Sequence, residues 1–352
     1  MANFKVGMIF DNEYINMLDE LNKSSDKNKI VEVYGSERAY AQYTARPSFR
    51  LPEISNNEFG DYIKKLREIS IGFLYTFNTN ALNKQEMIEE KKKILQRVDQ
   101  LLNIGVKGFI VTLPFVASMI REVSSEAEVH ISTIAHIETI TQIDIWKEKY
   151  DISSVCMNLQ KNREISFLKK CAKYCNKNAI KLELMVNEFC GNGTSNGAGH
   201  CIYRDHCYLL HSIGYTKEEY DKEPYPMSEC MASRNNAKQW MKMNYIRPED
   251  VQKYEDIGIS NFKITGRTGT LEYLKKVIAA YIGQTYNGNL LQLWRHLENI
   301  EEKEFTPHTF IDNNKLNNFI NFWFENPNHR CSEQVCGVTC DYCNRYYEAN
   351  VK

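Results

Sequence analysis

Eight short runs of apolar and β-branched residues recur along the chain as far as residue 265, and segments with a helical pattern separate them. Buried parallel strands have this nearly continuous apolar character because both faces of their sheet are covered. Eight strands alternating with helices predict an α/β fold, a (β/α)8 TIM-like barrel, and an open doubly wound sheet is the alternative. The expected strands are Phe4–Phe10, Ile30–Tyr34, Ile71–Phe77, Gly108–Leu113, Val129–Ala135, Ser154–Leu159, Leu182–Asn187 and Asn261–Thr265.

Three of the segments between these runs have a clear helical signal. In Lys84–Asn103 the apolar residues fall on one face at a period of 3.6, and Gly105 follows, where a helix commonly ends. Glu164–Cys175 has the same pattern, as does Glu249–Ile257, which begins after Pro248. We therefore expect helices to connect the strands.

The chain divides into a barrel over residues 1–290 and a helical, cysteine-rich extension over residues 291–352. Two connections within the barrel are unusually long. Gly35–Phe59 contains three arginines and could fold over the barrel mouth, and residues 189–244 form an insertion after the seventh strand. Connections longer than about 15 residues in a compact domain usually have a function.

The overall charge excludes some classes of partner. Lysine plus arginine is 44 and aspartate plus glutamate is 45, so the net charge is −1. We expect no DNA binding, although a local basic patch that contacts RNA stays open. The sequence has no apolar run of about 18 residues, as a membrane helix needs, and it begins without a secretory signal pattern, so we expect a cytoplasmic protein.

Polar residues follow the predicted strands, at the end of a barrel where active sites lie. Most are neutral or cationic, which suits a small anionic substrate. Each residue taken alone could equally be a loop cap or a solvated side chain. Arginine can bind a carboxylate or phosphate through two parallel hydrogen bonds. The residues that we expect to bind substrate are Arg163, Asn187, Arg247, Lys263 and Arg267.

The 11 cysteines are an odd number in a chain that looks cytoplasmic, where structural disulfides are rare. Cys156, Cys171 and Cys175 lie inside predicted elements and are expected to pack in the core. The other eight form two groups of four.

The first group has the spacing C-x10-C-x5-C-x22-C and lies in the long insertion. Four thiolates can bind zinc or an iron–sulfur cluster. The wide, irregular spacing differs from the paired C-x2-C knuckles of a zinc ribbon and favours a 4Fe-4S cluster. Its members are Cys190, Cys201, Cys207 and Cys230.

The second group, with the spacing C-x4-C-x3-C-x2-C, closes the chain. Its inner part matches the C-x3-C-x2-C motif of radical S-adenosylmethionine enzymes, but that motif follows the first strand of a barrel and lacks the extra cysteine. This second metal site could hold either a fully ligated iron–sulfur cluster or a structural zinc ion. Its members are Cys331, Cys336, Cys340 and Cys343.

Several segments resemble the U32 family of collagenase-like peptidases. They are Gln160–Lys170, Leu182–Cys190, Cys201–Cys207 and Ile246–Arg267, with a weaker match at Ser132–Ile137, and the likeness spans roughly residues 105–290. The resemblance implies a barrel with a 4Fe-4S cluster on four cysteines, which correspond in place to the first group here. The spacing departs from the commoner C-x6-C-x15-C arrangement, and the tail cysteines are not a general family feature.

The resemblance implies two kinds of activity. Some members are named as peptidases, and others act in oxygen-independent hydroxylation of a ubiquinone precursor or of RNA bases, in some cases with prephenate implicated. We expect an iron–sulfur oxidoreductase of the hydroxylase type that acts on a small anionic molecule or an RNA base and needs an electron donor.

Two alternatives remain. The first is a U32-type peptidase, although the sequence contains neither an H-E-x-x-H nor a G-x-S-x-G motif. Cys207 could pair with His206 or His211 as a catalytic cysteine, but a thiolate that ligates a cluster is not a free nucleophile. The other alternative is a non-catalytic iron–sulfur subunit that holds a protein partner or relays electrons.

Overall fold

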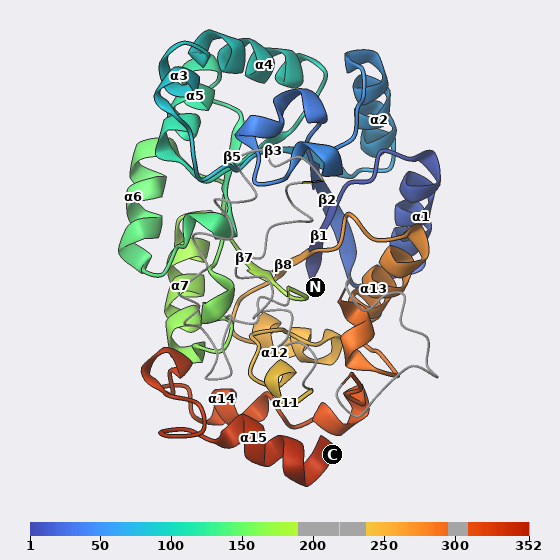
Figure 1. The fold of residues 1–352 in the computed structure, drawn as a ribbon, viewed down its shortest axis with the longest axis vertical. Coiled ribbons are helices and arrows are strands. Elements are labelled where there is room, and N and C mark those ends of the chain that lie inside the picture. The colour runs from blue at the N-terminus through green and yellow to red at the C-terminus, as the bar shows by residue number, and fades with distance from the viewer. Residues whose placement is uncertain (189–217, 219–236, 295–308, 352) are drawn as a thin grey trace.

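The computed structural model describes residues 1–188, 218, 237–294 and 309–351. Eight parallel strands close into a barrel in chain order, because β8 pairs with β1. Helices surround the strands (Figure 1), so the (β/α)8 prediction is confirmed over the doubly wound sheet. The strands are β1 (Asn3–Gly7), β2 (Lys29–Gly35), β3 (Gly72–Phe77), β4 (Gly108–Val111), β5 (Glu128–Ile131), β6 (Ser154–Cys156), β7 (Lys181–Met185) and β8 (Asn261–Ile264).

The expected helix Lys84–Asn103 is two helices, because the chain leaves helical geometry at Glu90, whose carboxylate accepts a hydrogen bond from Tyr43. The expected helix at Glu249–Ile257 begins as a 3-10 turn at Pro248–Asp250. The described helices are α1 (Asn12–Lys23), α2 (Asn56–Glu68), α3 (Lys84–Ile88), α4 (Lys91–Asn103), α5 (Pro114–Val123), α6 (Ile140–Tyr150), α7 (Ile165–Lys177), α11 (Ala237–Trp240), α12 (Val251–Glu255), α13 (Leu271–Gly283), α14 (Asn321–Glu325) and α15 (Tyr342–Tyr346).

Six of the eight strands end earlier than the apolar runs that predicted them, while β2 and β3 do not. β5 stops at Ile131, where the Ser132 hydroxyl accepts a hydrogen bond from the Ile134 N–H and starts a 3-10 turn. That turn ends at His136, which has a left-handed φ of 50°. The remaining residues of the predicted strand, Ser132–Ala135, therefore belong to the loop that follows β5.

The two faces of the barrel wall differ in chemistry. The face toward the helices is apolar and includes Phe4, Phe109 and Phe262. The inner face carries several charged residues, since the pairing sets Lys5 opposite Glu32 and Cys156 opposite Glu183, while Tyr34, Leu74 and Ile110 form a small cluster apart from the main core. Successive strand residues point to opposite faces, so one charge at every second position is enough to build such an interior.

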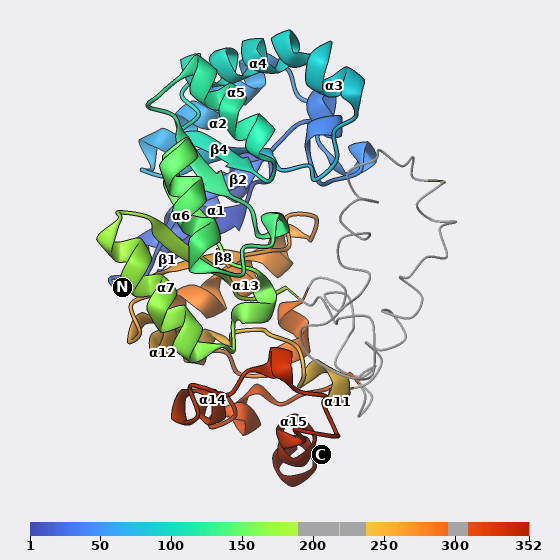
Figure 2. The same ribbon diagram turned by 90° about the vertical axis from the view of Figure 1, so that its left-hand side faces the viewer.

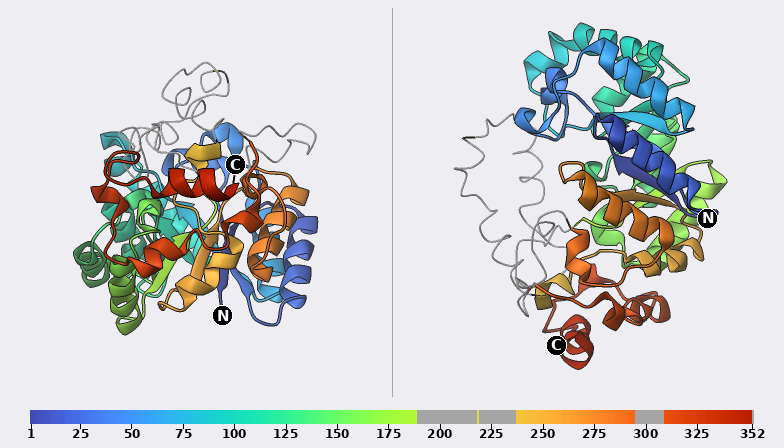
Figure 3. Two further views of the ribbon diagram at one scale, coloured as in Figure 1. Left: turned by 90° about the horizontal axis from the view of Figure 1, so that it is seen from below. Right: turned by 90° about the vertical axis from the view of Figure 1, so that its right-hand side faces the viewer.

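The C-terminal extension packs beside the barrel, next to α7, α11 and α12 (Figures 2 and 3). The Ser166 N–H donates to the carbonyl of Pro327 at 3.0 Å, and Phe324 packs edge-on against Tyr254. Trp323 is buried. None of the described helices is long and apolar enough to cross a membrane.

Candidate functional site

A cavity of about 530 Å³ opens at the carboxyl end of the barrel, beside β1, β2 and β8. Met8 and Phe10 follow β1, Ser36 follows β2, and Arg267 follows β8. The 3-10 turn at Ser48–Arg50 and the residues around it form the outer wall. The long connection between β2 and α2 thus lies against the barrel mouth, as the sequence predicts.

Two cations meet one aromatic ring at this mouth. The Lys263 ammonium lies 4.2 Å from the centroid of the Tyr34 ring, and the Arg267 guanidinium lies 5.8 Å from it. Within the described part of the chain, neither has a carboxylate at salt-bridge distance. Burial lowers the pKa of Lys263 below its usual value and does the same to Arg267, where Arg46 adds to the effect. A bound anion would relieve this unfavourable burial of positive charge.

Glu37 is the buried carboxylate that follows β2, and it does not balance these cations. It accepts hydrogen bonds from the Arg97 Nη2 at 2.8 Å and from the Tyr75 hydroxyl at 3.0 Å. Because Arg97 already neutralises it, Glu37 is not available to balance Lys263 and Arg267.

Asn187 joins the ends of β7 and β8. Its side-chain oxygen accepts from the Thr265 N–H at 2.7 Å, and its amide nitrogen donates to the Thr265 and Leu293 carbonyls. These hydrogen bonds connect the ends of the two strands at the edge of the mouth. Asn187 therefore lies at the mouth, as the sequence predicts, but its side-chain amide is hydrogen-bonded to the protein's own backbone.

The other two predicted substrate residues lie under the C-terminal extension. Arg247 is fully buried in a two-pronged ion pair with Asp250, at 2.9 Å for both nitrogens, and it also donates to the Asn313 carbonyl. Arg163 faces the tail cysteines. The structure therefore brings Lys263 and Arg267 together and does not bring Arg163 or Arg247 to them.

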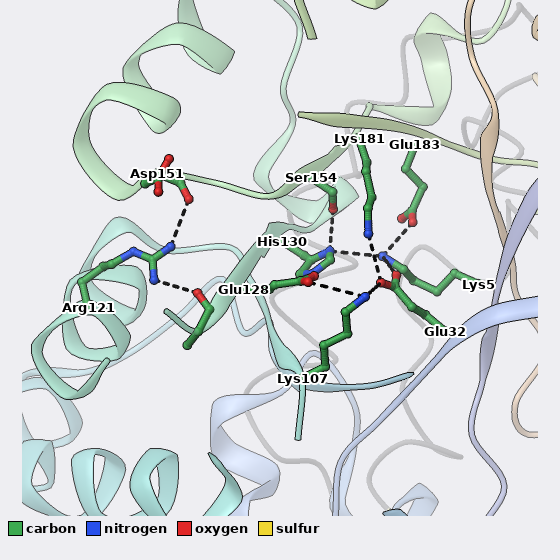
Figure 4. A network of polar contacts seen from close by, with 11 residues as sticks. Lys5, Glu32, Lys107, Arg121, Glu128, His130, Asp151, Ser154, Lys181 and Glu183 are labelled. Atoms are coloured by element: carbon green, nitrogen blue, oxygen red, sulfur yellow. Dashed lines mark hydrogen bonds and ion pairs between the residues drawn. The ribbon is translucent and has the colours of Figure 1, made fainter. Parts of the chain in front are cut away.

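A network of charges fills the amino-terminal part of the barrel interior (Figure 4). The Lys5 ammonium lies 2.8 Å from Glu183 and 3.3 Å from Glu32. Lys107 and Lys181 also contact Glu32, at 2.8 and 3.4 Å. Burial alone would raise the pKa of Glu32, but Lys5 and the other cations hold it well below its usual range. The sequence signal for this network lies in ionisable residues at alternate strand positions, Glu128 and His130 on β5 and Lys181 and Glu183 on β7.

One corner of this network has the residue types of a metal site. Ligand atoms of Glu32, Glu128 and His130 lie within 4.8 Å of one another. However, Lys107 lies 2.8 Å from Glu32 and 3.5 Å from Glu128, and Lys5 contacts Glu32 as well. These ammonium groups already neutralise the carboxylates and would repel a metal cation, so the residues do not fit a metal site.

The four tail cysteines come together at a second cavity, as their sequence spacing predicts. Their thiols form no disulfide. Cys336 and Cys340 face each other across a tight turn, in which the Gly337 N–H donates to the Cys340 carbonyl at 2.7 Å. Gly337 has a φ of 84°, which glycine adopts without strain. The sulfur-bearing residues that line the cavity are Cys331, Cys336, Cys340 and Cys343.

The remaining cysteines divide as follows. Cys156, Cys171 and Cys175 are buried and pack in the barrel wall or on the inner side of α7, as expected. The first predicted metal site falls outside the described residues, so its ligands stay a prediction. They are Cys190, Cys201, Cys207 and Cys230.

Comparisons with known proteins agree with this architecture. The family model for peptidase family U32 matches residues 26–318. A protein of Methanocaldococcus jannaschii, named as an uncharacterized protease, is 24% identical over 360 residues, covering 100% of this chain and 97% of the relative. The solved structure of a U32 peptidase has a TM-score of 0.50 at 13% identity, covering 76% of this chain and 93% of that one. The chain belongs to peptidase family U32.

Proposed function

We propose that the protein is an iron–sulfur-dependent oxidoreductase of the hydroxylase type, which binds a small anionic molecule or an RNA base at the barrel mouth. The observation that carries this proposal is the pairing of buried Lys263 with half-buried Arg267 beside Tyr34. Within the described residues, neither cation has a carboxylate at salt-bridge distance, so together they provide an anion site, and the adjoining cavity of about 530 Å³ has the size of a small-molecule pocket.

The proposed cluster is that of the first cysteine group. Cys190 follows Asn187 by three residues in the sequence, and Asn187 holds the edge of the mouth. Cys190, Cys201, Cys207 and Cys230 would be the ligands. When bound, such a cluster supplies electron-transfer or Lewis-acid chemistry that side chains lack. The chain's own contribution is to hold the substrate anion on Lys263 and Arg267 and to keep it from bulk water.

The family name supports a peptidase as the second candidate. One constellation of the described residues has the connectivity of a hydrolytic triad: the Ser154 hydroxyl lies 2.6 Å from His130 Nδ1, and Glu128 lies 2.9 Å from Nε2. Ser154 and His130 are only 2% and 1% exposed, however, and Lys5 also contacts His130. The strand register sets Ser154 at the first position of β6, at the opposite end from the mouth cavity. This placement favours a structural role for the three residues.

The anion site is tested by binding. Isothermal titration with prephenate and a set of simple dicarboxylates would compare wild type with Lys263→Met and Arg267→Met. A hydrogen bond to a charged group contributes about 1.5–3 kcal/mol, so each variant should lose about 10- to 150-fold in affinity. Arg38→Met is the matched control, because Arg38 belongs to the same mouth connection but is paired with Glu53. Equal affinities in all four proteins would refute the anion site.

The redox and peptidase proposals are separated by metal analysis and activity. Protein purified without oxygen should be brown, with absorbance near 400 nm and iron matched by acid-labile sulfide. Cys190→Ser and Cys201→Ser should each reduce both. Cleavage of a casein substrate that survives iron chelation but is lost in Ser154→Ala would instead establish the peptidase.

A further inference from the structure

The tail cysteines line one cavity with a buried cation. Arg163 is about 1% exposed, and its Nη1 lies 3.1 Å from the Met241 carbonyl and 3.9 Å from the Cys343 sulfur. Its Nε and Nη2 atoms are buried without a hydrogen-bond partner. The guanidinium also lies 4.4 Å from the centroid of the Trp323 ring. Two unused donors on a buried cation point to negative charge in the cavity.

The charges that line this cavity do not supply that negative charge. Its ionisable residues, apart from the thiols and His329, are Arg163, Lys242 and Asp341. Among the described residues, Arg163 has no carboxylate at salt-bridge distance, since the arginine ion pairs are those of Arg38, Arg97, Arg247 and Arg330. Four cysteine thiolates around a metal centre would supply it, because such a centre retains net negative charge.

The separation of the sulfur atoms favours an iron–sulfur cluster over a zinc ion. Tetrahedral zinc with Zn–S bonds of about 2.3 Å sets its sulfur ligands about 3.8 Å apart. Among the described residues, one group of three possible ligand atoms lies within 4.8 Å of one another, and it consists of Glu32, Glu128 and His130. No three of the tail sulfur atoms are therefore that close together. An iron–sulfur cluster binds its cysteines through separate iron atoms and so requires wider spacing.

We propose that Cys331, Cys336, Cys340 and Cys343 bind an iron–sulfur cluster, and that Arg163 is the buried counter-charge of its thiolate shell. With these four cysteines to hold it, such a cluster would supply one-electron transfer and would have no iron position left for substrate.

Two contacts made by this chain's own residues would tune the reduction potential of a cluster held there. The Trp323 indole N–H donates to the Cys331 sulfur at 3.2 Å, and Arg163 lies against the Cys343 sulfur. Hydrogen bonds to the sulfurs and nearby positive charge stabilise the reduced, more negative form. Both contacts therefore raise the potential.

Metal analysis of the full chain tests the site. The Cys336→Ser/Cys340→Ser variant changes two partly exposed residues, and Cys171→Ala is the matched control because Cys171 is buried on α7. After anaerobic purification, the double variant should lose iron and sulfide in equal amounts, while the control keeps both. Loss of zinc with iron unchanged, or no metal loss in a variant with a wild-type circular dichroism spectrum, would overturn the proposal.

This test is independent of the cluster proposed for the barrel mouth. If both clusters exist, the tail variant and Cys190→Ser each remove a different part of the iron. If only the tail cluster exists, Cys190→Ser leaves iron unchanged and the tail variant removes all of it. If only the mouth cluster exists, the tail variant keeps all of its iron.

The role of Arg163 is tested by redox titration followed by electron paramagnetic resonance. Arg163→Met should shift the potential of the tail cluster to a more negative value, whereas Arg163→Lys keeps a charge and should shift it less. Trp323→Phe keeps an aromatic ring but removes the N–H donor, and should also shift it downward. An unchanged potential in Arg163→Met and Trp323→Phe, with iron content intact, would refute these assignments.

Discussion

Replacing Lys5 with methionine should strongly destabilise the barrel. Lys5 and Glu183 are each about 95% buried and 2.8 Å apart. With an effective dielectric constant of about 20, their attraction is about 6 kcal/mol before the cost of burying both charges. Glu32 keeps Lys107 and Lys181 after the change, so Glu183 is the carboxylate left without its partner. Removing one member of a buried pair costs about 3–5 kcal/mol, which we expect in urea unfolding followed by tryptophan fluorescence.

A double variant isolates the charge effect. Lys5→Met/Glu183→Met replaces both charges with apolar side chains, and its free energy of unfolding should lie within about 2 kcal/mol of wild type. Lys23→Met is the control, because Lys23 is 75% exposed and its pair with Asp19 contributes at most about 0.5 kcal/mol. A Lys5→Met loss below about 1 kcal/mol, or a double variant as unstable as the sum of its singles, contradicts the reasoning.

The cost of Lys5→Met should also depend on pH. Burial raises the pKa of Glu183, but nearby positive charges, of which Lys5 has the largest effect, bring that pKa below its usual value. In wild type this lowered pKa contributes stability above about pH 4.3, which is lost as the pH falls through the folded-state pKa. Without Lys5, burial dominates and the pKa rises, so protonation relieves the stranded charge. The difference between wild type and Lys5→Met should therefore be larger at pH 7.5 than at pH 5.

Three further variants test other parts of the barrel. Arg247→Met breaks the buried pair with Asp250 and should cost about 3–5 kcal/mol in urea unfolding, without changing anion binding at the mouth. Gly108→Ala would set a methyl group 2.3 Å from the Glu128 carbonyl oxygen on the next strand, so we expect it to lower the free energy of unfolding by about 3 kcal/mol. A melting temperature equal to that of wild type would contradict this expectation. Burial, and after it the charge of Lys5, lowers the pKa of His130, so the free energy of unfolding should decrease as the pH falls below about 6.5. His130→Gln should reduce the slope of unfolding free energy against pH, by at most about 1.4 kcal/mol per pH unit.

The architecture follows from local sequence patterns, and for that reason it could be predicted. All eight expected strands overlap observed ones, because each run is long enough to show its apolar face. The ends of the strands were less predictable. β6 covers Ser154–Cys156, half of its apolar run, since Asn158 caps a 3-10 turn with its side chain. A side-chain cap of this kind leaves little trace in hydrophobic periodicity.

The functional site could be predicted only in part. Lys263 and Arg267 share one strand end, so their sequence positions suffice to bring them together. Arg163 and Arg247 also follow strands or precede helices, but the C-terminal extension covers them. Arg163 meets Cys343 across 180 residues of sequence, a contact that no local pattern encodes. The spacing of the tail cysteines was local and therefore informative.

The charged interior has a consequence for how this barrel folds. Lys5 lies on β1 and Glu183 on β7, and β8 stands between those strands. Until β8 joins both, the wall is open and the two charges lack the geometry that compensates their burial. Lys5 can contact Glu32 on the neighbouring β2 without β8, whereas its ion pair with Glu183 needs the closed wall. The Lys5–Glu183 pair therefore contributes its stabilisation to the complete barrel and not to a sheet that lacks its last strand.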